Sequence, residues 1–320
     1  MVFSCIALLV SSCGDTGTGP GDEPGPYPEY MRDFVVDISD YADAVDPGFI
    51  VVPQNGQELL TTDLEPTGAL VSYYAEAIDG QGREDLFFGY AADDQQTPEG
   101  ETGWILQFLE LAESNGVEAM VIDYCWTQWK VDSSYAWNEA EGFVSFAADH
   151  RDLDDIPGYP AEPWQANTDD VTTLGDAQNF LYLINDQCFA SVDDFISALD
   201  ATGYDMFVID LFCCGEQLTS AHVQQLKTKP GGGSRLVLCY MSIGEAEDYR
   251  WYWQPEWESN PPSWLGPENP DWPGNYLVKY WYPDWQAIIF GSADSYLDRI
   301  LAAGFDGVYL DKVDSYEEYI

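Results

Sequence analysis

Residues 303–319 read AGFDGVYLDKVDSYEEY, and within them the short run Gly307–Asp311 ends on a carboxylate. A short, mostly apolar run of this kind is typical of a strand in a parallel sheet that is covered on both faces. The sequence contains further runs of this kind upstream. We therefore expect strands at Phe49–Pro53, Val71–Ile78, Ala119–Asp123, Phe143–Ala147, Phe180–Ile184, Met206–Asp210, Leu236–Met241 and Gly307–Asp311.

Helical segments lie between many of these strands. Met31–Asp46 has apolar residues at helical spacing, and Pro47-Gly48 ends it. Further helices are expected at Trp104–Asn115, Val192–Ala201 and Trp285–Ala303. Eight strands with intervening helices predict a (β/α)8 barrel, the TIM-barrel architecture, as one domain over residues 30–320. An open, doubly wound sheet is the alternative, although no Gly-rich dinucleotide-binding turn follows a strand.

The order of these elements is unusual for a barrel. A (β/α)8 chain normally opens with a strand and closes with a helix. Here a helix comes first, and the sequence ends nine residues after Asp311. Residues 152–178, between the fourth and fifth strands, are rich in Pro, Asp and Thr and are expected to form a linker. Together these features predict a barrel whose chain is opened at an unusual place.

The chain is strongly acidic. Its 320 residues include 57 Asp and Glu against 11 Lys and Arg, which gives a formal net charge of −46. Nucleic acids and anionic membrane surfaces are excluded as partners, because clustered Lys and Arg bind them. Aromatic residues make up 15% of the chain, unlike an acidic disordered tail. Two interpretations remain, a solvated surface suited to high salt and the attraction of a cationic substrate.

Few residues are available for metal or thiol chemistry. The two histidines, His150 and His222, are too few for a His-rich zinc site or a choice of Ser-His-Asp triads. We therefore expect carboxylates to carry any acid–base chemistry, with no cofactor and no metal. The cysteines beyond the first 13 residues could form one disulfide. Cys239 lies in an apolar run and is expected to be a buried free thiol. These cysteines are Cys125, Cys188, Cys213, Cys214 and Cys239.

Residues 1–13, MVFSCIALLVSSC, resemble an export signal. A short apolar run precedes Val-Ser-Ser-Cys, which is similar to a bacterial lipobox with Cys13 as the lipidated residue. The run is too short to span a bilayer, and residues 14–29, rich in Gly, Pro and Asp, suit a tether. We expect a monomeric extracytoplasmic protein. It is anchored by lipid on Cys13 or, if the signal is an ordinary cleaved peptide, secreted.

Polar and aromatic residues gather where the expected strands end, which is where barrel enzymes carry their sites. Glycoside hydrolysis needs such carboxylates, because one carboxyl protonates the leaving oxygen while the other attacks carbon or activates water. Between Trp251 and Trp285 the chain has seven tryptophans, of which we expect two or three to stack on sugar rings. The candidate site residues are Asn55, Glu58, Asp123, Tyr124, Asp210, Tyr240, Glu247, Arg250, Trp281, Asp311 and Asp314.

Several long motifs make the chain recognisable. They are FIVVPQNGQELL (49–60), IDGQGREDLFFGY (78–90), YMSIGEAEDYRWYW (240–253), ENPDWPGNYLVKYWYPDWQ (268–286) and AGFDGVYLDKVDSYEEY (303–319). They resemble glycoside hydrolase family 114, the endo-α-1,4-polygalactosaminidase-like (β/α)8 proteins. The resemblance covers nearly all of residues 30–320. It implies an endo-acting glycosidase whose substrate is an α-linked, amino-sugar polysaccharide, a cationic polymer suited to an acidic cleft.

The order of the motifs departs from that of the family. There, segments like YLIN, VIDL and SIGEAEDYR come first and the PQNG segment comes later, whereas here the PQNG segment precedes the others. The resemblance therefore implies a circular permutation in which residues 152–178 join the family's usual ends. A fragment of tandem domains, or a misassembled sequence, is the alternative.

The resemblance also implies roles for individual residues. Glu58 of PQNGQE would be the general acid, and Asp311 of GVYLD the nucleophile or base, on strands that adjoin in a closed barrel. Arg250 and Glu247 would hold substrate or orient Asp311. Two further carboxylates are expected to close the rim beside Glu58, namely Asp79 and Glu84.

Two other functions compete with hydrolysis. A carbohydrate-binding barrel that has lost turnover is the main alternative, although both expected catalytic residues are present. An old label for some relatives suggests a synthetase-like enzyme. The chain has no HIGH-type or P-loop motif, and its charge is wrong for tRNA.

Overall fold

The computed structural model describes residues 25–320. The expected signal with Cys13 and most of the expected tether lie outside this part of the chain. Helix α1 (Tyr27–Val45) includes the last three residues of the expected tether, and Pro28 stands in its first turn. Its apolar stripe, which includes Phe34 and Ile38, is buried against the rest of the molecule.

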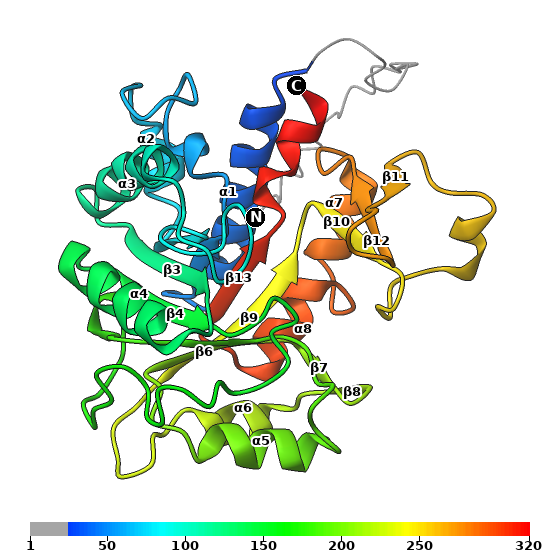
Figure 1. The fold of residues 1–320 in the computed structure, drawn as a ribbon. Helices are drawn as coiled ribbons and strands as arrows, with labels where there is room; N and C mark the ends of the chain where they lie inside the picture. Colours follow the sequence, from blue (N-terminus) through cyan, green and yellow to red (C-terminus); the bar gives the residue numbers. More distant parts are fainter. Residues whose placement is uncertain (1–24) are drawn as a thin grey trace, which may run out of the picture.

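Eight parallel strands form the centre of the molecule (Figure 1). One sheet has the order β1-β13-β9-β6-β5 and the other β2-β3-β4, and every pairing within them is parallel. Parallel bridges from Gln54 to Gly82 and from Ser145 to Asn179 connect the edges of the two sheets. The strand bounds are β1 Ile50–Pro53, β2 Gly80–Glu84, β3 Glu118–Tyr124, β4 Val144–Ala148, β5 Leu181–Leu183, β6 Met206–Ile209, β9 Leu236–Ser242 and β13 Gly307–Asp311.

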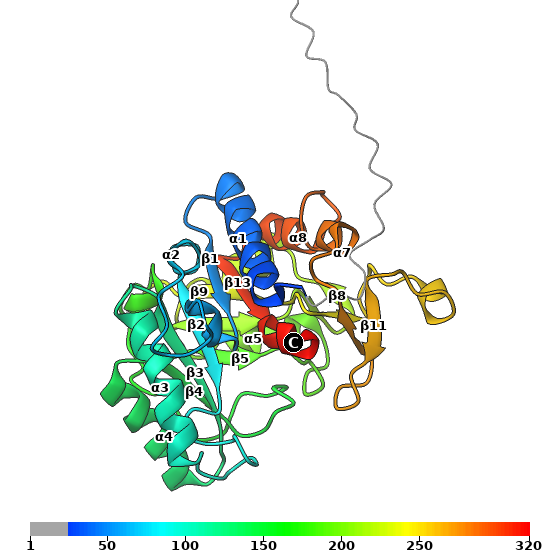
Figure 2. The same ribbon diagram turned by 90° about the horizontal axis from the view of Figure 1, so that it is seen from above.

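Helices and short antiparallel pieces surround these strands (Figures 1 and 2). The sequence predicted one helix over Trp285–Ala303, but Gly291, with φ of 105°, lies in a break between α7 and α8. The other helices are α2 Ser72–Ala75, α3 Glu99–Glu113, α4 Gln128–Glu141, α5 Val192–Asp200, α6 Ser220–Leu226, α7 Pro283–Ile289 and α8 Tyr296–Ala303. The 3-10 segments are η1 Gln57–Leu60, η2 Leu174–Asp176, η3 Pro255–Glu258 and η4 Val313–Tyr319. The antiparallel pieces are β7 Phe212–Cys213 with β8 Glu216–Gln217, and β10 Glu245–Glu247 with β12 Asn275–Val278 and β11 Leu265–Glu268.

The α/β class and the parallel strands expected from the sequence are confirmed, with one strand misplaced. Val71–Ile78 contains the short helix α2 and not a strand, and the second strand is the Gly-rich Gly80–Glu84. Its glycines are required by close packing, because a Cβ on Gly82 would lie 2.2 Å from the Tyr309 hydroxyl oxygen. Hydrophobic pattern alone therefore could not reveal this strand.

Contacts between Tyr182 and Tyr309 show how the five-stranded sheet curves. Tyr182 on β5 and Tyr309 on β13 have ring centroids 5.2 Å apart, although two strands separate them in the sheet. The Tyr182 hydroxyl also donates a hydrogen bond to Gln54, just beyond β1, at 2.9 Å. The sheet edge at β5 thus approaches the edge at β1.

The structure also describes the expected linker and the five cysteines. Residues 152–178 are mostly irregular, with the short η2 near their end, and lie between β4 and β5. All five cysteines of the described chain have free thiols. Among residues 25–320, no helix has the length and apolar sequence that a membrane span requires.

Candidate active site

Two carboxylates, Asp311 and Glu84, occupy the carboxyl ends of β13 and β2, with β1 between these strands. The Asp311 carboxylate accepts hydrogen bonds from the Tyr240 hydroxyl and from the Lys312 backbone N–H, both at 2.8 Å. Burial, followed by the negative charge of Glu84, raises the pKa of Asp311 to about 7. The two carboxylates therefore interact, which is the arrangement that acid–base chemistry with paired carboxyls needs.

Glu84 is held by donors from both neighbouring strands. The Tyr124 hydroxyl at the end of β3 donates to one carboxylate oxygen at 2.6 Å, and the Asn55 side-chain amide donates to the other at 2.8 Å. Asn55 has φ of 58°, a left-handed conformation that Asn adopts more readily than most residues. Its side-chain oxygen accepts from the Glu84 N–H at 3.3 Å, which fixes the amide orientation. Glu84 is therefore fixed in position by three strand ends.

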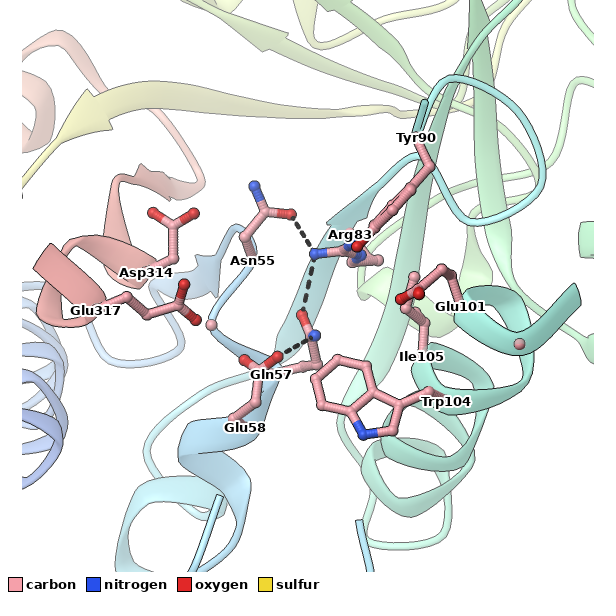
Figure 3. Close-up of a pocket in the computed structure, with 12 residues that line it drawn as sticks. Asn55, Gln57, Glu58, Arg83, Tyr90, Glu101, Trp104, Ile105, Asp314 and Glu317 are labelled. Carbon is pink, nitrogen blue, oxygen red and sulfur yellow. Dashed lines mark hydrogen bonds between the residues drawn. The ribbon is translucent and has the colours of Figure 1, made fainter. Parts of the chain in front are cut away.

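An open cavity of about 650 Å³ is lined by Asn55, the residue that donates to Glu84, whereas Glu84 and Asp311 are not among its lining residues (Figure 3). Glu101 and Trp104 of α3 form one wall, and Asp314 and Glu317 of η4 form the opposite wall (Figure 3). The other lining residues are Asn55, Gly56, Gln57, Glu58, Arg83, Tyr90, Gly100 and Ile105. Four carboxylates and a single arginine thus line a space with an aromatic wall.

Glu58 is buried at the floor of this cavity. It accepts a hydrogen bond from the Gln57 side-chain amide at 2.7 Å, and the Tyr316 hydroxyl lies 3.4 Å from its other oxygen. Burial raises the pKa of Glu58 to about 7, the negative charges of Glu317 and Asp314 add to the shift, and Arg83 opposes it. Glu58 therefore interacts electrostatically with the cavity walls.

Arg250 belongs to a buried ion-pair group and not to the cavity lining. Its guanidinium donates to both carboxylate oxygens of Asp210, at 2.8 and 2.6 Å, and to Glu247 at 2.6 Å. The three residues are no more than 8% exposed. They connect the ends of β6 and β10. Because their hydrogen-bonding groups already bind one another, we expect them to hold these strand ends in place and not to bind substrate directly.

Three other residues singled out in the sequence lie away from the cavity. Asp123 is fully buried and accepts from two backbone N–H groups and the Ser134 hydroxyl, so it anchors the loop after β2 to α4. Trp281 packs in an aromatic cluster with Tyr27 and Tyr319. Asp79 was expected at the rim but precedes β2, where it accepts from the Val51 N–H at 2.8 Å.

One protein-family model matches part of this chain. Residues 161–319, which include β5, β6, β9 and β13, match the model of the glycoside-hydrolase family GH114. This part of the chain belongs to GH114. The resemblance expected from the motifs is therefore confirmed for residues 161–319.

Three relatives of this chain are uncharacterized proteins. One from Methanocaldococcus jannaschii is 41% identical over 151 residues, covering 47% of this chain and 42% of that protein. One from Thermotoga maritima is 44% identical over 119 residues, covering 37% and 35% of the two chains. One from Deinococcus radiodurans is 40% identical over 124 residues, covering 39% and 38%. Each match thus spans less than half of the relative's length.

Sequence reasoning about the GH114 site missed part of the cavity. Glu101 and Trp104 come from the start of α3, in an acidic helical segment that resembles an ordinary solvated surface. Arg83 was missed because β2 lacks an apolar pattern, although the adjoining Glu84 was expected at the rim. The motif IDGQGREDLFFGY contained the signal, since its charged residues directly follow Gly-Gln-Gly.

Proposed function

We propose that this chain is an exported glycoside hydrolase in which Asp311 and Glu84 form the reacting carboxylate pair. The single observation that carries the proposal is the buried Asp311 carboxyl, whose pKa is raised to about 7 by burial and then by the negative charge of Glu84. Glu58, which the resemblance implied as Asp311's partner, lies at the floor of the neighbouring cavity. We assign it to substrate binding there.

The chemistry of the pair follows from its protonation. Because the pKa of Asp311 is raised to about 7, part of the protein carries a proton on this carboxyl around neutral pH. The protonated carboxyl donates its proton to the glycosidic oxygen as the bond from that oxygen to the anomeric carbon breaks. The ionised carboxylate either attacks the anomeric carbon or takes a proton from the attacking water. Water completes the reaction by adding to the sugar.

We propose an α-linked, galactosamine-type polysaccharide as the substrate, cleaved within the chain. Glu58, Glu101, Asp314 and Glu317 give the cavity a negative character that favours protonated amino groups, and Trp104 offers a face for a sugar ring. The cavity is open, so a polymer can pass through it. The net charge of −46 adds a long-range attraction for a polycation.

We also propose that the strands form a closed (β/α)8 barrel in circularly permuted order. Around the ring each strand adjoins the next in sequence, and β1 pairs with β13. In Figures 1 and 2, α1 lies beside the C-terminal segment, and the rings of Tyr27 and Tyr319 are 5.3 Å apart. A short connection could therefore join these segments in the family's order. Export through the signal expected in residues 1–13, with Cys13 as lipid anchor, is part of the same proposal.

The test is a substrate screen with the purified protein. Partially deacetylated galactosaminoglycan, chitosan and a neutral α-linked glucan are each incubated with the wild type and with Asp311→Asn. The proposal predicts release of oligosaccharides from the galactosamine polymer by the wild type alone. Binding of the polymer without cleavage by either protein would support the alternative of an inactive binding barrel. Cleavage of the neutral glucan only would overturn the proposed substrate.

A further inference from the structure

Two adjacent thiols and a carboxylate meet at the ends of β5 and β6. The Sγ atoms of Cys213 and Cys214 are 3.6 Å apart. Together with a carboxylate oxygen of Asp186, they form a group of three atoms that all lie within 4.8 Å of one another. Asp186 follows β5, whereas Cys213 ends β7 and Cys214 begins the turn of the β7–β8 hairpin, which follows β6. The group therefore connects two loops that are distant in sequence.

The spacing of the two sulfurs matches that of thiolates on one tetrahedral ion. Zinc–sulfur bonds of about 2.3 Å at a tetrahedral angle place two sulfurs about 3.8 Å apart. A disulfide instead requires sulfurs about 2.05 Å apart and Cα atoms about 4.4–6.8 Å apart, whereas sequence neighbours have Cα atoms about 3.8 Å apart. The observed 3.6 Å therefore fits a shared metal ion better than a bond between these thiols.

The surroundings also favour a cation. Cys213 is 1% exposed, so its sulfur is shielded from bulk water. The negative charges of Asp186 and Asp210 act on this thiol, and they attract a positive ion, which deprotonates the thiols that coordinate it. The Cys214 backbone N–H donates to Asp186, so the hairpin and the carboxylate are already in contact without the metal.

We propose that Asp186, Cys213 and Cys214 bind one thiophilic divalent cation, with Zn²⁺ as the physiological choice. No metal was expected from the sequence because it contains only two histidines, but this donor set includes no histidine. The fourth position is open to water. The bound ion ties the loop after β5 to the β7–β8 hairpin, in which Phe212 donates its N–H to Asp210 at 2.7 Å. The proposal does not depend on hydrolase activity.

The site is tested by metal titration of the intact, reduced protein. Co²⁺ is added first, because a thiolate ligand produces a charge-transfer band in the near ultraviolet, and Zn²⁺ is then added to displace it. Affinity for Zn²⁺ is measured by competition with a chromophoric chelator. The variants are Cys213→Ser, Cys214→Ser and Asp186→Asn, and the matched control is Cys188→Ser, which removes an exposed thiol outside the group.

The wild type and Cys188→Ser should bind one equivalent, with a cobalt–thiolate band that Zn²⁺ abolishes. Cys213→Ser and Cys214→Ser should each weaken Zn²⁺ binding by at least about 100-fold, because loss of an outer-shell partner alone costs about 10- to 100-fold. Asp186→Asn should bind Zn²⁺ more weakly but keep the cobalt–thiolate band. This variant tests the site even if a cysteine variant fails to fold. The proposal is overturned if the reduced protein binds no metal, if cysteine variants with native circular dichroism bind as tightly as wild type, or if a Cys213–Cys214 disulfide forms despite excess Zn²⁺.

Discussion

Replacing Arg250 with methionine should cost more stability than almost any other single change of a charged residue. Arg250 makes four hydrogen bonds to Asp210 and Glu247, at 2.6, 2.6, 2.8 and 3.2 Å. Methionine fills a similar length but leaves two buried carboxylates without their cation. Removing one partner from a buried pair costs about 3–5 kcal/mol. For a domain of this size that corresponds to a fall in melting temperature of about 6–20 °C.

Thermal unfolding followed by near-ultraviolet circular dichroism measures this loss, since the tryptophans report on tertiary packing. Arg299→Met is the matched control, because Arg299 lies 3.6 Å from Asp294, which is 94% exposed. Because Asp294 is solvated, this ion pair contributes only about 0–1 kcal/mol, and its loss leaves no carboxylate buried without a cation. The triple variant Asp210→Asn, Arg250→Met, Glu247→Gln should recover much of the loss, because no charge is then buried alone.

Two results would refute this reasoning. One is a loss in Arg250→Met no larger than that in Arg299→Met. The other is a triple variant as unstable as Arg250→Met alone. Either result would show that the carboxylates of Asp210 and Glu247 are solvated in a way that the buried geometry does not allow.

Three further predictions follow from other parts of the structure. Gly82→Ala should lower the free energy of unfolding by about 1–3 kcal/mol or more, because its Cβ would meet the Tyr309 hydroxyl, whereas Gly100→Ala, with open space, should cost nothing in urea denaturation. Glu58 and Asp311 both have a pKa raised to about 7, so the folded protein holds more protons than the unfolded chain between about pH 4 and 7. Its stability should therefore fall as pH rises through that window, and Glu58→Gln should make the decline shallower. Binding of a cationic galactosamine polymer should weaken steeply with added NaCl, and calorimetry should show no such dependence for a neutral glucan.

Apolar strands were predictable from the sequence, and a glycine-rich strand was not. Seven of the eight strands were found because each has an apolar core, as in Gly307–Asp311, whose bounds are confirmed. β2 uses Gly80 and Gly82 to admit neighbouring side chains, so its sequence resembles a turn. Because the second strand was predicted at Val71–Ile78, Asp79 was expected at the rim, and Glu84 was given only a minor role.

Single site residues at the end of an apolar strand were predictable from the sequence. Pairs formed by residues from different strands were not. Asp311 and Asn55 follow apolar runs directly, and both lie at the strand ends as expected. The partner of Asp311 depends on which strand end faces it across β1, and no spacing in the sequence encodes that. The same holds for Asp210, which pairs with Arg250 forty residues away. Likewise, Asp186 joins Cys213 and Cys214 only through the fold.

The most direct test of the central claim compares kcat/KM on the galactosamine polymer for Asp311→Asn, Glu84→Gln and Glu58→Gln. Removal of a group that transfers a proton in the reaction typically costs about 10²- to 10⁴-fold. The account predicts a loss of that size for Asp311→Asn and Glu84→Gln, with polymer binding retained, and a loss mainly in KM for Glu58→Gln. A full loss of kcat in Glu58→Gln together with near-normal turnover by Glu84→Gln would contradict it.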